Sequence, residues 1–273
     1  MIALKKLLSS VEENKSMLCV GLDIDPRKLP EGCDESIKSL ARFTLNIIEA
    51  TSDIVAAYKP NLAFYEALGP EGLSLLKLVC DRIPDDTVII LDGKRGDIGN
   101  TGEFYAKTCF EVYGADWATV NPYMGYDSIR PFVRYKNNGV FILCLTSNSG
   151  ARDFQRLEIG NRPLYMHVAE KTVSWNKNNN CGLVVGATYA EQLTKVRRIA
   201  EDMPLLIPGV GAQGGDLEKS VLGGTDNFKK PAIINVSRSV LYASEKSDYA
   251  EAARAVVEKL NGDISQLRQK PIS

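Results

Sequence analysis

The densest cluster of residues able to do chemistry is the run Asp-Gly-Lys-Arg-Gly-Asp at positions 92–97. Asp92 and Lys94 follow an apolar run and are two residues apart. On a β-strand this spacing puts both side chains on the same face as Ile90 and opposite Leu91. Charges on an inward face are unfavourable unless they are paired, so we expect these two to offset each other. A ligand carboxylate held about 4 Å from Asp92 would be repelled by roughly 4 kcal/mol at an effective dielectric constant near 20, which favours chemistry that expels a carboxylate.

Two further charges stand where other apolar runs end. Asp23 follows the first such run and Lys59 follows the second. A single charge of this kind is commonly a solvated loop residue. Charges at the ends of three consecutive predicted strands instead favour one shared site, with Lys59 as a second cation beside Asp92. Asp25 is the alternative to Asp23 if the first strand ends later.

Two segments in the last third of the chain predict a phosphate site. Residues 208–216 read Pro-Gly-Val-Gly-Ala-Gln-Gly-Gly-Asp, a loop whose backbone N–H groups can approach an anion closely. Residues 235–239 read Asn-Val-Ser-Arg-Ser, and Arg238 offers a planar fork of donors suited to phosphate. The competing interpretation is a pair of ordinary glycine turns.

The composition argues against several classes of protein. The 273 residues carry 33 Lys and Arg against 34 Asp and Glu, without the basic surplus that nucleic-acid binding needs. No apolar stretch reaches the about 20 residues that span a membrane, and the first residues lack the features of a signal peptide. Six scattered cysteines without a Cys-x-x-Cys pair argue against zinc and predict a reducing, cytoplasmic location. Because His167 is the single histidine, we expect Lys and Asp to transfer protons, without a metal or an organic cofactor.

The elements that must position these residues alternate between strand and helix. Three-and-four spacing of apolar residues predicts helices at 37–50 and 249–260. Strands are expected at 17–25, 54–61, 87–94, 117–122, 140–147, 182–187, 205–210 and 232–237. Eight strands alternating with helices favour a single-domain (β/α)8 TIM barrel over residues 1–273, with a doubly wound open sheet as the alternative. Residues 148–180 are expected to form an enlarged loop plus a helix after the fifth strand.

The order of these motifs resembles the orotidine 5′-phosphate decarboxylase family over almost the whole chain. The matching residues are Asp23 after Gly-Leu, Lys59 in Tyr-Lys-Pro-Asn, the run Asp92-x-Lys94-x-x-Asp97-Ile98-x-x-Thr101, the glycine-rich loop at 209–215 and Ser-Arg-Ser at 237–239. The Asp-x-Lys-x-x-Asp motif alone is shared by a wider superfamily of barrels. The sequence Lys-Arg-Gly-Asp at 94–97 and the long segment after the fifth strand resemble those of the longer bacterial subgroup of this family.

The resemblance implies a role for each matching residue. Lys94 would protonate C6 of the pyrimidine as carbon dioxide leaves, and Asp92 would lie beside the departing carboxylate. Lys59 would anchor the charged network and, with Asp23, bind ribose hydroxyls. Asp97 would reach into the neighbouring subunit's site, with Ile98 and Thr101 near the same ribose. Ser147 would contact the pyrimidine edge, with Thr146 and Ser149 as alternatives. Gln213 would bridge base and phosphate, and Arg238 would bind the phosphate. The resemblance therefore implies a cofactor-free conversion of orotidine 5′-phosphate to uridine 5′-phosphate by a homodimer with shared active sites.

Two other interpretations remain open at this point. A 3-keto-sugar-phosphate decarboxylase or aldolase of the same superfamily would use Asp92 to help hold magnesium. That class usually carries another acid near the end of the second strand, where this chain has Lys59. A non-catalytic sensor of a phosphate ligand would not need Lys94 between two acids.

Overall fold

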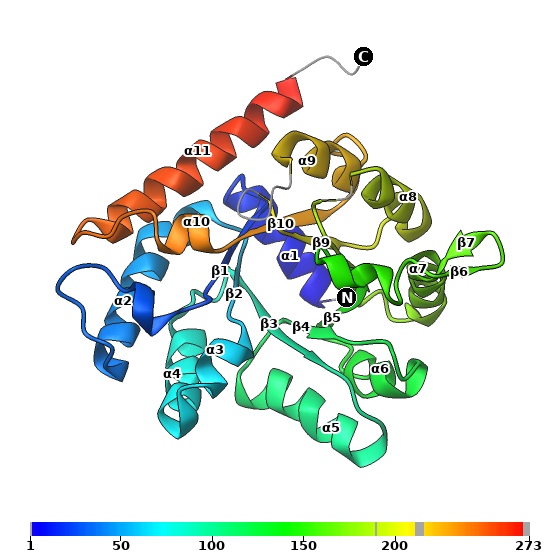
Figure 1. Ribbon diagram of the computed structural model, residues 1–273, viewed down its shortest axis with the longest axis horizontal. Helices are drawn as coiled ribbons and strands as arrows, with labels where there is room; N and C mark the ends of the chain where they lie inside the picture. Colours follow the sequence, from blue (N-terminus) through cyan, green and yellow to red (C-terminus); the bar gives the residue numbers. More distant parts are fainter. Residues whose placement is uncertain (1, 189, 211–215, 270–273) are drawn as a thin grey trace.

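The computed structural model describes residues 2–188, 190–210 and 216–269. Eight parallel strands close a barrel in the order β1-β10-β9-β8-β5-β4-β3-β2 (Figure 1). The barrel strands are β1 (Leu18–Gly21), β2 (Ala57–Lys59), β3 (Val88–Arg95), β4 (Trp117–Val120), β5 (Gly139–Leu145), β8 (Cys181–Val185), β9 (Leu205–Pro208) and β10 (Ala232–Val236). Each overlaps one predicted range, so the (β/α)8 barrel is confirmed and the open sheet is wrong.

The first strand is shorter than its predicted range, which reached residue 25. β1 ends at Gly21, and the N–H of Leu22 makes a further hydrogen bond, of 3.1 Å, to the carbonyl of Lys59. Asp23 therefore lies just beyond the strand rather than within it.

Helices surround the barrel and cover its outer face (Figure 1). They are α2 (Ile37–Thr51), α3 (Leu62–Glu66), α4 (Gly69–Arg82), α5 (Gly99–Lys107), α6 (Tyr126–Val133), α7 (Leu164–Trp175), α8 (Ala190–Ala200), α9 (Leu217–Thr225), α10 (Arg238–Leu241) and α11 (Tyr249–Gln269). The predicted helices at 37–50 and 249–260 correspond to α2 and α11. Shorter helical turns are η1 (Pro26–Lys28), η2 (Ser52–Ile54), η3 (Thr108–Val112) and η4 (Ser149–Arg152).

Strand alternation divides the buried side chains into two clusters. On β3, Ile89 and Leu91 pack outward against the helices, whereas Val88 and Ile90 point into the barrel with Trp117 and Phe141. The Trp117 ring fills the space beside Gly139, where an added Cβ would lie 2.3 Å from it. The same alternation brings Asp92 to the inner face, as predicted, whereas Lys94 reaches the cavity through an irregularity of β3 between Leu91 and Arg95.

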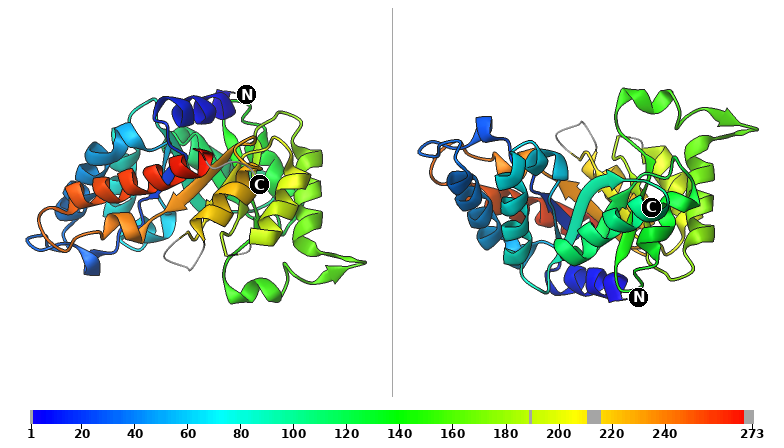
Figure 2. Two further views of the ribbon diagram at one scale, coloured as in Figure 1. Left: turned by 90° about the horizontal axis from the view of Figure 1, so that it is seen from above. Right: turned by 90° about the horizontal axis from the view of Figure 1, so that it is seen from below.

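Helix α1 (Ile2–Glu13) covers the amino-terminal end of the barrel (Figure 2). Ala3 and Leu7 join the inner cluster, and the Trp117 indole donates a 3.3 Å hydrogen bond to the Ala3 carbonyl. Ser10 donates a 2.8 Å hydrogen bond to the carbonyl of Ala56. This end of the barrel is therefore filled, and the chemistry-bearing residues gather at the opposite, carboxyl end.

The segment at 148–180 contains the expected helix, α7, and one feature that we did not predict. A two-stranded antiparallel hairpin, β6 (Glu158–Ile159) with β7 (Arg162–Pro163), projects from the molecule on the side away from α1 (Figure 2). Its strands are two residues long, too short for an alternating pattern to be visible in the sequence. Among the described residues, no helix is long and apolar enough to cross a membrane.

Candidate active site

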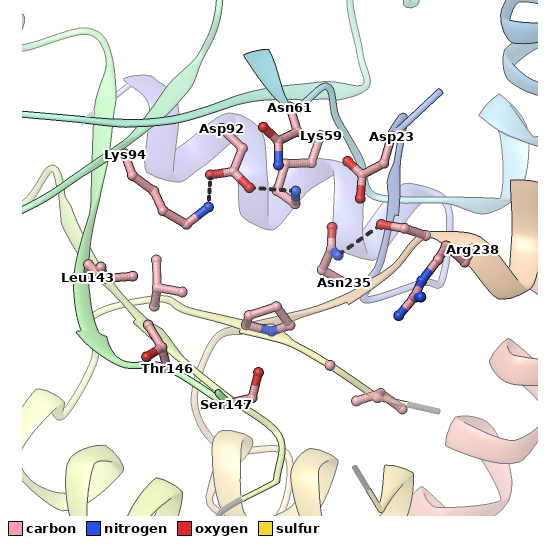
Figure 3. A pocket seen from close by; sticks show the side chains of 15 residues that line it. Asp23, Lys59, Asn61, Asp92, Lys94, Leu143, Thr146, Ser147, Asn235 and Arg238 are labelled. Carbon is pink, nitrogen blue, oxygen red and sulfur yellow. Dashed lines mark hydrogen bonds and ion pairs between the residues drawn. The ribbon is translucent and has the colours of Figure 1, made fainter. Parts of the chain in front are cut away.

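A cavity of about 250 Å³ opens at the carboxyl end of the barrel. Six of the predicted site residues line it: Asp23, Lys59, Asp92, Lys94, Ser147 and Arg238. They come from five different strand ends, so the closed barrel brings together positions that are up to 215 residues apart. Figure 3 shows Lys94 and Arg238 toward opposite ends of this cavity, with Asp92 and Lys59 between them.

The Asp92 carboxylate lies between two ammonium groups. Lys59 Nζ is 2.8 Å from Oδ2 of Asp92, and Lys94 Nζ is 2.8 Å from Oδ1 (Figure 3). The Lys59 and Asp92 side chains are only 5% and 8% exposed, whereas the Lys94 side chain is 45% exposed. Lys59 and Asp92 therefore form the buried base of the network, and Lys94 extends from it into the open cavity.

The two buried partners keep each other charged. Burial by itself would raise the pKa of Asp92, but the positive charges of Lys59 and Lys94 outweigh it and lower that pKa well below its ordinary value. Burial would lower the pKa of Lys59, but the negative charges of Asp92 and Asp23 outweigh it and raise that pKa. Asp92 therefore stays ionised at neutral pH, and its negative charge can repel the carboxylate of a bound ligand.

Asp23 reaches the cavity although it lies beyond β1. Its Oδ1 atom is buried and has no hydrogen-bond partner among the described residues. Buried acceptors are nearly always paired, so this oxygen suits a hydroxyl of a bound ligand. Asp25 faces elsewhere, because its carboxylate accepts the N–H of Arg27 at the start of η1 and pairs with the Arg27 guanidinium at 2.8 Å. Of the two candidate acids, Asp23 lines the cavity and Asp25 does not.

The other end of the cavity is formed after β9 and β10. Pro208 and Gly209 line it from one side, and Ser237 and Arg238 line it from the other. Gly21 allows this arrangement because a Cβ there would lie 1.9 Å from Oγ of Ser237. Arg238 is exposed, and Figure 3 shows its guanidinium beside the cavity. The predicted residue Gln213 lies outside the described residues.

Three predicted residues do not line this cavity. Asp97, Ile98 and Thr101 lie where β3 leads into α5, and Ile98 is 54% exposed. Oδ1 of Asp97 accepts a 2.8 Å hydrogen bond from the N–H of Ile98. Within one chain, these residues are therefore on the outer surface beside the cavity rather than in it.

Three polar residues around the charged network were not predicted. Asn61 and Asn235 line the cavity, and Oδ1 of Asn235 is buried without a hydrogen-bond partner in the part of the chain that the structure describes. Thr119, which is 2% exposed, donates a 2.7 Å hydrogen bond to Oδ1 of Asp92. Each lies two residues after an inward-facing residue of a barrel strand, and this spacing could have identified them from the sequence. Thr146 and Ser147 both line the cavity, whereas Ser149 does not.

Comparisons with known proteins agree with the geometry. The model of a family described as orotidine 5′-phosphate decarboxylase / HUMPS family matches residues 16–256. An orotidine 5′-phosphate decarboxylase of Dehalococcoides mccartyi is 47% identical over 271 residues, covering 98% of both chains. One from Herpetosiphon aurantiacus is 48% identical over 257 residues, covering 93% of this chain and 95% of the relative. The solved structure of Leishmania donovani OMP decarboxylase is 37% identical, with a TM-score of 0.86, over 99% of this chain and 100% of that one.

Proposed function

Because the chain belongs to the orotidine 5′-phosphate decarboxylase / HUMPS family, we propose that it converts orotidine 5′-phosphate to uridine 5′-phosphate and carbon dioxide, the last step of de novo UMP synthesis. The observation that carries this proposal is the ionised Asp92 between two ammonium groups in a cavity whose far end holds Arg238. The enzyme is then a carbon–carbon lyase.

Lys94 is the proton donor in this proposal. The bond between C6 and the carboxylate breaks, carbon dioxide leaves, and the electron pair remains on C6. The ammonium of Lys94 stabilises the developing negative charge and then donates its proton to C6, which leaves a neutral amine. Placing a cation where charge develops is usually the largest contribution to catalysis. The half-exposed Lys94 side chain can regain its proton from water after product leaves.

Asp92 has two roles in the proposed reaction. It holds the Lys94 ammonium at 2.8 Å, and its negative charge faces the substrate carboxylate. Leu143 and Val184 line the same cavity with apolar surface, which weakens screening of that repulsion. Because both reactive groups belong to the chain, we propose that the reaction needs no metal or organic cofactor.

Substrate binding is assigned to residues away from C6. Asp23 and Lys59 would bind the ribose hydroxyls, and Arg238 would bind the phosphate. Gln213 would bridge base and phosphate, and Ser147 would contact the pyrimidine edge. Oδ1 of Asp23, which has no partner among the residues that the structure describes, and the exposed Arg238 side chain support the first two assignments. Binding energy from the phosphate can contribute to rate as well as affinity when it stabilises the assembled site.

We propose that the active form is a homodimer with shared sites. Asp97, Ile98 and Thr101 would then reach the substrate of the partner subunit. Exposed apolar residues support an interface that includes this segment: Ile98 just before α5, Phe104 within α5, and Tyr123, Met124 and Phe154 from the segments after β4 and β5. Large exposed apolar patches commonly mark interaction surfaces.

We also propose a cytoplasmic location. All six cysteines are free, and five of them are buried. Burial raises the pKa of Cys19 and Cys144 to about 12, so their thiols stay protonated and unreactive at neutral pH. Free thiols of this kind are typical of a reducing compartment.

The function is tested by mixing the purified protein with orotidine 5′-phosphate in the presence of a chelator and following ultraviolet absorbance. We expect turnover without added metal and uridine 5′-phosphate as the product. An absence of turnover would rule out this substrate. Activity that requires added magnesium would support the related sugar-phosphate chemistry instead.

A further inference from the structure

The backbone of Lys94 has an unusual conformation. Its φ is 44°, in the left-handed region that residues with a side chain rarely adopt. The pairing of β3 with β4 shifts at the same place, because Leu91 pairs with Ala118 but Arg95 pairs with Val120. Extra residues in β3 thus form an irregularity that turns Lys94 toward the cavity. Such strained positions persist only where the surrounding structure holds them.

The hydroxyl of Thr119 lies at the centre of this irregularity. Thr119 Oγ1 accepts a 3.0 Å hydrogen bond from the backbone N–H of Lys94. The same oxygen donates a 2.7 Å hydrogen bond to Oδ1 of Asp92, the atom that also receives the Lys94 ammonium. One hydroxyl therefore connects the main chain of Lys94 to the carboxylate that orients its side chain.

The direction of these two bonds is determined by chemistry. A hydroxyl has one hydrogen, and the backbone N–H can only donate, so the hydrogen of Thr119 must point to Asp92. Thr119 itself is held by the pairing of β4 with β5, where it lies opposite Phe141. As a β-branched residue with restricted rotation about its first side-chain bond, it presents the hydroxyl at a constant position.

We infer that Thr119 is a positioning residue for the proposed decarboxylation, holding Lys94 and Asp92 in their reactive arrangement. The inference rests on the proposed function, and it adds a role for a residue that touches neither the phosphate end nor the cavity surface. Loss of the hydroxyl removes one bond from the Lys94 backbone and one from Asp92. A small displacement of a reacting group, on the order of 1 Å, can lower a rate by about 100-fold.

The first experiment compares steady-state kinetics of the wild type, Thr119→Val and Thr119→Ser. Val has nearly the shape of Thr but no hydroxyl, so we expect kcat to fall by roughly 10- to 100-fold. KM should change by less than about threefold, because the proposed phosphate and ribose contacts are made elsewhere. Thr119→Ser keeps the hydroxyl and should recover kcat to within about threefold of the wild type.

Thr172→Val is the matched control. Thr172 is also fully buried, and its hydroxyl donates a 2.9 Å hydrogen bond to the Val168 carbonyl within α7, away from the cavity. It should lose a similar hydrogen bond while keeping the wild-type kcat. If Thr119→Val does not fold, the pair Thr119→Ser and Thr119→Ala repeats the comparison without the γ-methyl group.

A second readout follows Lys94 directly. Exchange of the C6 hydrogen of uridine 5′-phosphate in D₂O, measured by NMR, needs proton transfer at C6 but no loss of carbon dioxide. It should slow in Thr119→Val by about the same factor as kcat. An unchanged kcat in the hydroxyl-free variants, or a loss that Ser does not rescue, would overturn the inference. Inactivity of the wild type is a different result and would reject the proposed function itself.

Discussion

The ammonium of Lys59 lies 2.8 Å from Oδ2 of Asp92, and both side chains are almost completely buried. Taking two charges out of water is costly, and the cost is offset only while both partners are present. This pair is more than a structural contact, because Asp92 also holds the half-exposed Lys94 through its other oxygen. The stability of the barrel and the placement of the proposed proton donor therefore depend on the same carboxylate.

Lys94→Ala should abolish most of the activity and leave the fold intact. Loss of a positioned proton donor costs about 100- to 10,000-fold in rate, and the half-exposed side chain contributes little to the core. The measurement is kcat on orotidine 5′-phosphate together with the thermal unfolding midpoint. Lys77→Ala is the control, since Lys77 is also 45% exposed and paired with an aspartate but lies on α4. Retained activity in Lys94→Ala would move the proton donor to another residue.

Asp92→Asn should destabilise the protein strongly. The substitution leaves Lys59 buried without its partner, and removing one member of a buried pair costs about 3–5 kcal/mol in the free energy of unfolding. Urea denaturation at pH 7 measures this free energy. Asp81→Asn, which breaks the exposed pair with Lys77, should cost less than about 1 kcal/mol. Equal effects of the two substitutions would contradict the assigned role of the buried pair.

The stabilisation from Asp92 should depend on pH in a defined window. The folded pKa of Asp92 lies below its ordinary 3.8, so its contribution is complete above that pH and is lost as the pH falls through the folded pKa. The folded pKa of Lys59 lies above its ordinary 10.5, so its contribution is complete below that pH and is lost as the pH rises through the folded pKa. The difference in unfolding free energy between wild type and Asp92→Asn should therefore be constant between about pH 5 and pH 9 and narrow in more acidic solution. A difference that grows toward acid pH would contradict this assignment.

Arg238→Ala should reduce the contribution of the substrate phosphate to binding and rate. Arginine forms a charge-assisted fork with phosphate, so its loss should lower kcat/KM for orotidine 5′-phosphate by at least about tenfold. Orotidine, which lacks the phosphate, is the internal control and should be converted equally slowly by the wild type and the variant. A similar loss on both substrates would place Arg238 in a general structural role instead.

Mixing two inactive variants tests the shared sites. Lys94→Ala and Asp97→Ala should each be inactive alone, because each lacks one group from every site. After subunit exchange at equal concentrations, about a quarter of all sites should contain both intact residues, since each heterodimer has one such site. Activity should therefore return to roughly a quarter of the wild-type value. No recovery despite exchange, verified by mass spectrometry of the mixed dimer, would refute sharing.

The sequence by itself determined the local features of this protein. Period-two alternation placed Asp92 on the inward face of β3, and the eight apolar runs predicted the barrel strands. These features depend on neighbours along the chain, so they are visible without a structure. The order of motifs, from Asp23 to Arg238, was enough to indicate the family.

Only the tertiary structure decided which polar groups meet. Thr119 and Asp92 are 27 residues apart, and their hydrogen bond depends on the irregular pairing of β3 with β4. The choice of Asp23 over Asp25 depends on where β1 ends and on the pairing of Asp25 with Arg27 outside the cavity. Such contacts are set by strand register and barrel closure, which no short stretch of sequence encodes. That is why the charged residues were predictable, whereas the hydroxyl that holds them was found only in the folded chain.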